Sequence, residues 1–105
     1  MADFMKMLQQ AQEVQGRLQQ LQEELQGKTV SAASGGGMVT VTADGKGQIR
    51  AVQIDPAVVD PSDTEMLEDL ILVAISEAQK KAAALAEEEM RKLTGGLSLP
   101  FQLPF

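Results

Sequence analysis

The sequence predicts an α+β protein of the order α-β-β-β-α, in which a three-stranded antiparallel meander lies between two long helices. Three observations support this fold class. Apolar residues recur three or four positions apart over residues 4–26 and 63–94, which is the spacing of an amphipathic helix. Residues 28–55 alternate polar and apolar side chains and contain glycine-rich turns. A length of 105 residues favours one domain over residues 1–96, followed by a tail over residues 97–105.

The composition argues against an enzyme. The chain contains no cysteine and no histidine, so it lacks the usual nucleophile and base of covalent catalysis. Neighbouring carboxylates such as Glu68 and Asp69 point in different directions on a helix and do not converge on a substrate. We therefore expect no catalytic activity, no small-molecule substrate and no cofactor. The longest apolar run, residues 70–75, is too short to cross a bilayer, and no signal peptide opens the chain, which predicts a cytoplasmic protein without a membrane partner.

The first helix carries a narrow apolar seam that repeats every seven residues, with Gly27 as its C-terminal stop. The seam consists of Phe4, Met7, Ala11, Val14, Leu18, Leu21 and Leu25. Such a seam fits either a helix docked on the sheet or a coiled-coil-like contact with a helix of the same chain or of a second copy. A rod of about 35 Å is longer than a three-stranded sheet is wide, which favours a contact beyond the sheet.

The sheet begins with Val30 and Ala32, which alternate with polar residues in a short strand. The glycines at 35–37 predict a turn or bulge rather than a phosphate loop, because a strand and not a helix follows them. A hairpin then closes through the three-residue loop Gly45–Gly47, with Gly47 in the left-handed conformation.

This loop length predicts the register and the faces of the hairpin. Odd-numbered residues pair with odd-numbered ones, so one face should hold Val39, Val41, Ala43, Ile49 and Ala51. The opposite face should then be apolar only at its far end, where Met38, Val52 and Ile54 lie. A half-apolar second face suggests that a partner covers it, and we expect that partner to be a second copy of the chain.

The second helix follows Asp60 or Ser62, either of which fits the pattern of an N-terminal cap. The aspartates of this loop lack the spacing of a calcium site, so no metal is expected. The helix is apolar on nearly all sides from Leu70 to Ile75, which predicts packing between the sheet and something else. The expected homodimer interface therefore contains Met38, Val52, Ile54, Leu70 and Ile71.

The second half of this helix keeps only a narrow apolar line among charged residues, and we expect it to project beside the first helix as an αα arm. The tail LSLPFQLPF over residues 97–105 is apolar and rich in proline, which excludes a helix or a central strand. It either docks in extended form on an apolar patch, such as the Met38, Val52 and Ile54 face of a partner, or is flexible. The sequence favours the flexible tail.

The charges give a mixed indication about nucleic acid. The net charge of −6 argues against a general attraction to DNA, so binding would need a local basic patch. Four glutamates precede basic residues by four positions, which predicts the ion pairs Glu13–Arg17, Glu77–Lys81, Glu87–Arg91 and Glu88–Lys92 on a solvated face. The cations of the arm nevertheless remain candidates for weak, salt-dependent contacts to phosphate.

The order of elements and two stretches of sequence resemble the YbaB/EbfC family. These stretches are GGGMVTVTADGKGQIRAVQIDP over residues 35–56 and DTEMLEDLILVAISEAQKKA over residues 63–82. The resemblance implies a small bacterial nucleoid-associated protein in the cytoplasm, a tight homodimer whose projecting helices contact double-stranded DNA. The matching cations in this chain are Lys6, Arg17, Lys80, Lys81, Arg91 and Lys92.

Two functions therefore follow as hypotheses. The first is a DNA-binding homodimer that contacts the duplex backbone through cations on its arms and reads little sequence. The alternative is a dimeric protein-interaction module, with no physiological DNA binding, in which acidic arms and the apolar tail recognise another protein.

Overall fold

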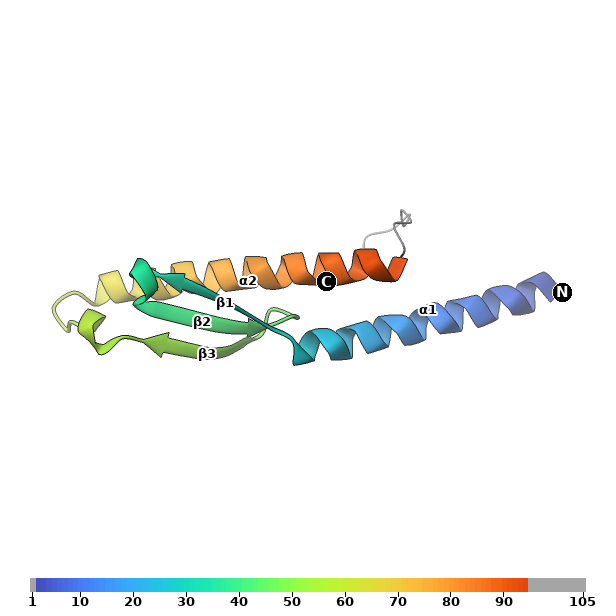
Figure 1. Ribbon diagram of the computed structural model, residues 1–105, viewed down its shortest axis with the longest axis horizontal. Helices are drawn as coiled ribbons and strands as arrows, with labels where there is room; N and C mark the ends of the chain where they lie inside the picture. The colour runs from blue at the N-terminus through green and yellow to red at the C-terminus, as the bar shows by residue number, and fades with distance from the viewer. Residues whose placement is uncertain (1, 95–105) are drawn as a thin grey trace.

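The computed structural model describes residues 2–94 and confirms the α-β-β-β-α order with its antiparallel meander β1-β2-β3. The molecule is elongated, with extents of 72 × 22 × 17 Å (Figure 1). Its helices are α1 (Ala2–Gly27) and α2 (Thr64–Thr94), and its strands are β1 (Thr29–Ser34), β2 (Val39–Asp44) and β3 (Ile49–Ile54). Two short 3-10 turns, η1 (Gly35–Gly37) and η2 (Pro56–Val58), link these elements. The tail at 97–105 lies outside the described residues. Neither described helix combines the length and hydropathy of a membrane span.

Helix α2 packs mainly on β1 and β2 through a stripe of small side chains. Ala74, Ala78, Ala82 and Ala86 are all buried and lie four residues apart. Ala74 and Ala78 belong to the core of the sheet, where they meet Val39 and Val41. Four residues advance a helix by about 40° beyond one turn, so the stripe winds around α2, and Ala86 faces α1 instead. One helix thus serves two hydrophobic cores.

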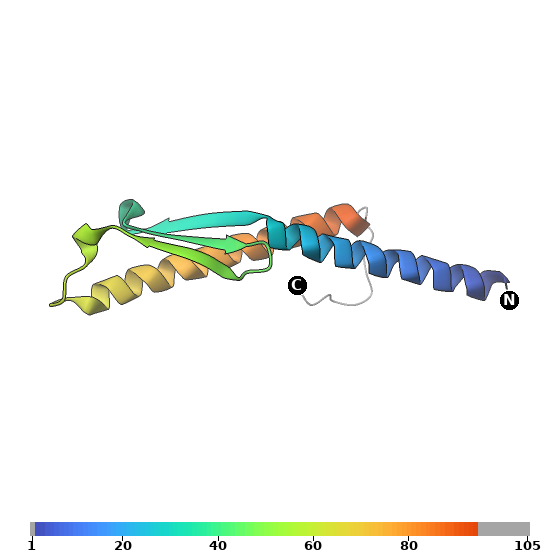
Figure 2. The ribbon, with the colours of Figure 1, turned by 90° about the horizontal axis from the view of Figure 1, so that it is seen from below.

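Among the described residues, helix α1 is anchored at its C-terminal end. Leu21 and Leu25 are buried against Ala86, with Leu85, Met90 and Leu93 packed around them. The N-terminal half of α1 continues past the sheet and past the described end of α2 (Figures 1 and 2). The predicted arm therefore forms over a short contact, and most of the α1 seam has no partner within the described residues.

The hairpin confirms the predicted loop and corrects the predicted register. The backbone N–H of Asp44 donates to the carbonyl of Gln48 at 2.9 Å, which closes the loop Gly45–Gly47, and Gly47 has φ +87°. Ala43 pairs with Ile49, as odd-to-odd pairing requires, but Thr42 pairs with Ala51. Arg50 is therefore an extra residue in β3. This β-bulge shifts every later pair by one position.

The bulge moves the apolar residues of β3 to the opposite face from the predicted one. Val52 pairs with Val41 and Ile54 pairs with Val39, and directly paired residues share a face of the sheet. Val52 and Ile54 thus lie on the side that carries α2, while Ala51 lies on the other side. Because α2 covers mainly β1 and β2, Val52 remains 43% exposed and Ile54 37% exposed.

The start of α2 also differs from the two predicted alternatives. The carboxylate of Asp63 accepts a hydrogen bond from the backbone N–H of Met66 at 3.2 Å, so Asp63 is the cap. Asp60 instead accepts hydrogen bonds from the hydroxyl and the N–H of Ser62, at 2.7 and 2.9 Å. These two bonds lower the pKa of Asp60 and shape the turn before the helix. The sequence patterns favoured Asp60 and Ser62 and did not indicate Asp63, although it directly precedes the helix.

We predict that Gly45→Ala loosens the attachment of α1. A Cβ atom at residue 45 would lie 2.6 Å from the carbonyl oxygen of Leu25, which is backbone and cannot rotate away. We expect a loss of about 1–3 kcal/mol in the free energy of unfolding, measured by urea denaturation.

Gly16→Ala is the matched control, because a Cβ at this helical position meets no atom within 4 Å. It should stabilise the chain by about 0.5–1 kcal/mol, since alanine is the better helix former. A Gly45→Ala variant as stable as wild type would contradict the close contact between the hairpin loop and α1.

Candidate nucleic-acid interface

Three segments meet where α1 ends, and we call this meeting point the joint: Leu25, Lys28, Asp44, Gly45 and Glu89. The backbone N–H of Gly45 donates to the carbonyl of Leu25 at 2.8 Å and to that of Lys28 at 3.0 Å. The first of these bonds joins the hairpin loop to the last turn of α1, where carbonyl groups have no partners within the helix. The joint therefore fixes where α1 leaves the sheet.

Asp44 organises the joint from a fully buried position. One carboxylate oxygen accepts the N–H groups of Lys46 and Gln48, at 2.9 and 3.0 Å. The other accepts both the Nε and the terminal nitrogen of Arg50, at 3.0 and 2.9 Å. Burial raises the pKa of this carboxyl, but the hydrogen bonds from Gln48, Lys46 and Arg50 outweigh burial and hold the pKa below its ordinary value. Asp44 is thus a charged, fully bonded anion.

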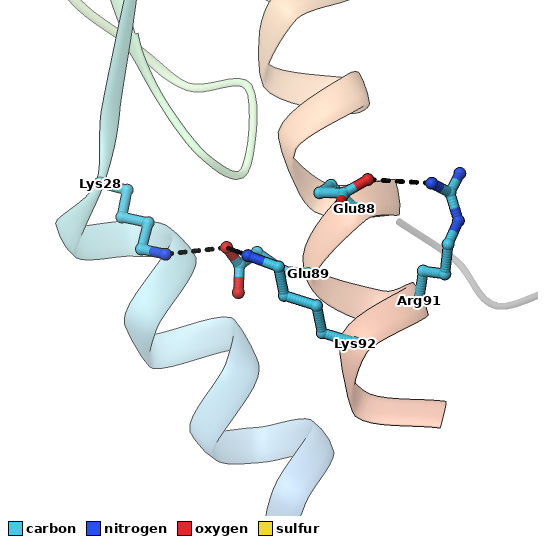
Figure 3. A network of polar contacts seen from close by, with 5 residues as sticks. All are labelled: Lys28, Glu88, Glu89, Arg91 and Lys92. Atoms are coloured by element: carbon cyan, nitrogen blue, oxygen red, sulfur yellow. Dashed lines mark hydrogen bonds and ion pairs between the residues drawn. The ribbon is translucent and has the colours of Figure 1, made fainter. Parts of the chain in front are cut away.

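Glu89 links the joint to the end of α2. Its carboxylate lies 2.9 Å from the ammonium of Lys28 and 3.7 Å from that of Lys92 (Figure 3). The hydrogen bond from Lys28, aided by the charges of Lys28 and Lys92, lowers the pKa of Glu89 against the opposing effect of burial. Arg17 and Lys92 line the cleft between α1 and α2 together with this glutamate and Glu24. The cleft therefore brings cations of both helices together.

The predicted ion pairs with a spacing of four are largely wrong. Lys80 pairs with Glu77 at 3.5 Å, Arg91 pairs with Glu88 at 2.9 Å, and Lys92 pairs with Glu89, all three residues apart. Residues three and four apart are both neighbours on a helix, so spacing does not choose between them. Figure 3 shows the Glu88–Arg91 pair on the side of α2 away from Lys28. Lys92 thus faces α1, while Arg91 does not.

The remaining predicted cations have different surroundings. Lys81 donates to the backbone carbonyl of Ser31 at 2.8 Å and so fastens α2 to the edge strand β1, instead of pairing with Glu77. Lys6 and Arg17 make no hydrogen bond or ion pair within residues 2–94, so the expected Glu13–Arg17 pair is absent there.

Sequence reasoning missed three cations near the joint: Lys28, Lys46 and Arg50. Lys28 and Glu89 are 61 residues apart, and only the fold brings them together. Lys46 is exposed in the hairpin loop beside Lys28. The only sequence signal near Lys46 and Arg50 was the Asp44-Gly45 turn. We used that turn to predict the length and register of the hairpin loop and not to predict a cluster of cations.

The charge of the chain is strongly segregated along its length. Residues 51–79 contain seven carboxylates and no lysine or arginine, so the other residues hold nine basic and eight acidic side chains. Six of the seven carboxylates lie between Asp55 and Asp69, at the end of the molecule opposite the free end of α1 (Figure 1). The net charge of −6 is therefore a property of one end, and the end with the helical arm is close to neutral. Within residues 2–94, no group of three or more carboxylates is arranged to hold a metal ion.

The chain is elongated, has the order α-β-β-β-α and carries a projecting helix. Its basic residues lie away from its acidic end. These features together are those of a small α+β protein with a helical arm. This chain belongs to the YbaB/EbfC DNA-binding family, whose model matches residues 1–97. The resemblance of residues 35–56 and 63–82 is therefore confirmed.

Relatives of nearly equal length support the assignment. The chain is 54% identical to a nucleoid-associated protein of Gemmatimonas aurantiaca, over 98% of this chain and 99% of that one. It is 48% identical to a nucleoid-associated protein of Rhodospirillum rubrum over the full length of both. A crystal structure of an uncharacterized Helicobacter pylori protein has a TM-score of 0.68 at 25% identity, over 85% of this chain and 89% of that one. The names of both bacterial relatives describe nucleoid association and not an enzyme, which agrees with the expected lack of catalysis.

We predict that the contribution of Asp44 to the free energy of unfolding decreases at acidic pH. Because the folded state lowers its pKa below the ordinary 3.8, this contribution is complete above that value and is lost as the pH falls through the folded-state pKa. Asp44→Asn should cost about 1–3 kcal/mol at neutral pH, since a buried charged partner of Arg50 is lost.

The difference between wild type and Asp44→Asn in urea denaturation should shrink as the pH falls below the ordinary pKa of 3.8 and through the lower folded-state pKa. The folded state also lowers the pKa values of Asp60 and Glu89, but both residues are present in both proteins and cancel in the comparison. A difference that stays constant down to pH 2 would show that the charge of Asp44 does not act as described.

Proposed function

We propose that this protein is a nucleoid-associated DNA-binding protein of the bacterial cytoplasm, a homodimer whose helical arms contact the duplex backbone with little sequence specificity. The segregation of charge is the observation that carries this proposal beyond family membership. Electrostatic interactions between exposed groups fade over about 8 Å at physiological ionic strength. The molecule is 72 Å long, so the acidic end does not repel a duplex that lies against the arm.

The cleft between α1 and α2 contributes two cations to the proposed contact surface. Arg17 and Lys92 line it together with Glu24 and Glu89, and Lys28 is ion-paired to this Glu89. Lysine and arginine side chains that contact phosphates fix the position of a protein on DNA without reading bases. The described residues insert no aromatic side chain here, which fits contacts to the backbone alone. Lys6, Lys80 and Arg91 extend the proposed contact surface along the two helices, whereas Lys81 is committed to β1.

An uncovered apolar surface supports the homodimer. Val52 and Ile54 of β3 are exposed, and Leu72 of α2 is 66% exposed. Of the other predicted interface residues, Met38, Leu70 and Ile71 are half-buried, and Leu70 and Ile71 pack against the core of the sheet. This apolar surface is continuous with the hydrophobic core. Interfaces of stable homodimers often have this character and resemble a domain core cut in half, so the surface favours contact with a second copy. The proposed interface is therefore on the α2 side of the sheet, at β3.

DNA binding should follow the charge at the end of α2. Arg91→Glu together with Lys92→Glu should abolish gel retardation of duplex DNA at physiological salt and reduce the salt dependence of the affinity, since each lost phosphate contact lowers the slope by about 0.9. Glu89→Gln should have the opposite effect, because it removes the anion that holds Lys28 and Lys92.

Glu68→Gln is the matched control, with the same change of one charge at the acidic end of the molecule. It should leave retardation unchanged. Equal effects of Glu68→Gln and Glu89→Gln would show that net charge, and not the arm, governs binding. If wild type gives no retardation even at low ionic strength, DNA binding fails for this protein and the protein-interaction module becomes the better function.

Val52→Asp should separate the dimer, because it places a carboxylate in the proposed interface. Sedimentation at micromolar concentration should then give the monomer mass of 11.2 kDa. Gln53 pairs with Thr40 and lies on the other face of the sheet, so a Gln53→Asp variant should remain dimeric. A wild-type protein that sediments at 11.2 kDa would contradict the proposed interface directly.

A further inference from the structure

The N-terminal half of α1 presents an apolar seam that the described residues leave uncovered. Phe4 is 64% exposed, Met7 66% and Val14 55%, whereas Leu21 is 5% exposed and Leu25 is fully buried. The boundary between these two halves lies where α2 ends, because Leu93 and Lys92 line the cleft opposite Leu21 and Arg17. Helix α2 therefore covers the seam only as far as it extends.

The segment that follows α2 has a one-sided apolar pattern. Its apolar side chains occupy every second position, at Leu97, Leu99, Phe101, Leu103 and Phe105, with Ser98, Pro100, Gln102 and Pro104 between them. Two prolines exclude a helix and favour an extended backbone. In an extended chain, alternate side chains point to one side. The pattern therefore predicts an extended strip with one apolar edge.

The strip and the uncovered seam match in position, direction and length. Helix α2 runs towards the N-terminal end of α1 and stops beside its middle (Figures 1 and 2). A chain that continues in this direction meets Leu18 first and Phe4 last. Residues 97–105 span about 26 Å when extended, and the seam from Leu18 to Phe4 spans about 21 Å.

We infer that residues 97–105 pack in extended form along the α1 seam of the same chain, antiparallel to α1, and complete the cover that α2 begins. The direction and length of the strip favour this occupant over a second α1. Leu8, Gln10 and Gln15 flank the middle of the seam, and the charged residues Asp3 and Arg17 flank only its two ends. Glutamine amides can instead donate to the carbonyl groups of an extended segment. Attachment through two glycines also gives the tail a high effective concentration.

The absence of cysteine from the chain makes this inference directly testable by disulfide trapping. The geometry places Leu99 close to Val14, so Val14→Cys with Leu99→Cys should form a disulfide within one chain under mild oxidation. Gln12→Cys with Leu99→Cys is the control, since residue 12 lies at the same height on the opposite side of α1. We expect the first pair to form at least tenfold faster. Equal rates, or a link found only between chains, would overturn the inference.

Methionine oxidation gives a second test in the native chain. Without a cover, Met7 should oxidise at least as fast as Met66, because the two side chains are 66% and 42% exposed. We expect Met7 to oxidise several-fold more slowly than Met66 when mass spectrometry follows treatment with peroxide. Leu99→Ser with Phe101→Ser and Leu103→Ser should reverse this order, whereas Ser98→Ala with Gln102→Ala should not.

The comparison of the two variants separates the tail from other occupants of the seam. Protection of Met7 that survives the three serine substitutions would assign the cover to a second copy and overturn the inference. Fast oxidation of Met7 in the wild-type protein would also overturn the inference, because it would show that the seam has no cover. Neither measurement uses DNA, so the inference stands or fails independently of the proposed function.

Discussion

The contact between the hairpin loop and the last turn of α1 is the constraint on which the rest of the molecule depends. Gly45 approaches the carbonyl of Leu25 so closely that no side chain fits between them. Asp44 holds the loop in this shape by accepting hydrogen bonds from Lys46, Gln48 and Arg50. Among residues 2–94, α1 packs on the rest of the chain through its C-terminal turns, so this contact and the Leu21, Leu25 and Ala86 core together set its direction. The position of Arg17 relative to Lys92 across the cleft follows from that direction.

The order of the elements could be predicted from the sequence because it depends on local periodicity, which α1, α2 and the Gly45–Gly47 loop display clearly. The faces of β3 could not be predicted. A bulge adds one unpaired residue to a strand and leaves the alternation of polar and apolar residues nearly intact. The sequence pattern therefore did not indicate that Arg50 is the bulged residue. The partners of Lys28 and Lys81 were equally hidden, because their partners Glu89 and Ser31 are distant in sequence and only the packed fold brings them close.

The acidic composition of the chain is compatible with a DNA-binding family once the charges are placed in space. Seven carboxylates gather in residues 51–79, and every lysine and arginine lies outside this segment. A rod-shaped molecule can keep such regions farther apart than a compact one of equal length. An acidic end of this kind would orient the protein near a polyanion, because the polyanion repels that end more strongly than the nearly neutral remainder.

The bulge at Arg50 decides which side of the sheet carries the apolar residues of β3. An unbroken ladder that continued from the Ala43–Ile49 pair would place Ala51 opposite Val41 and leave Val52 and Ile54 on the side away from α2. The bulge instead gives Val52 and Ile54 direct partners in Val41 and Val39, on the side that carries α2. One extra residue in β3 therefore joins the exposed apolar surface of this strand to the core of the molecule.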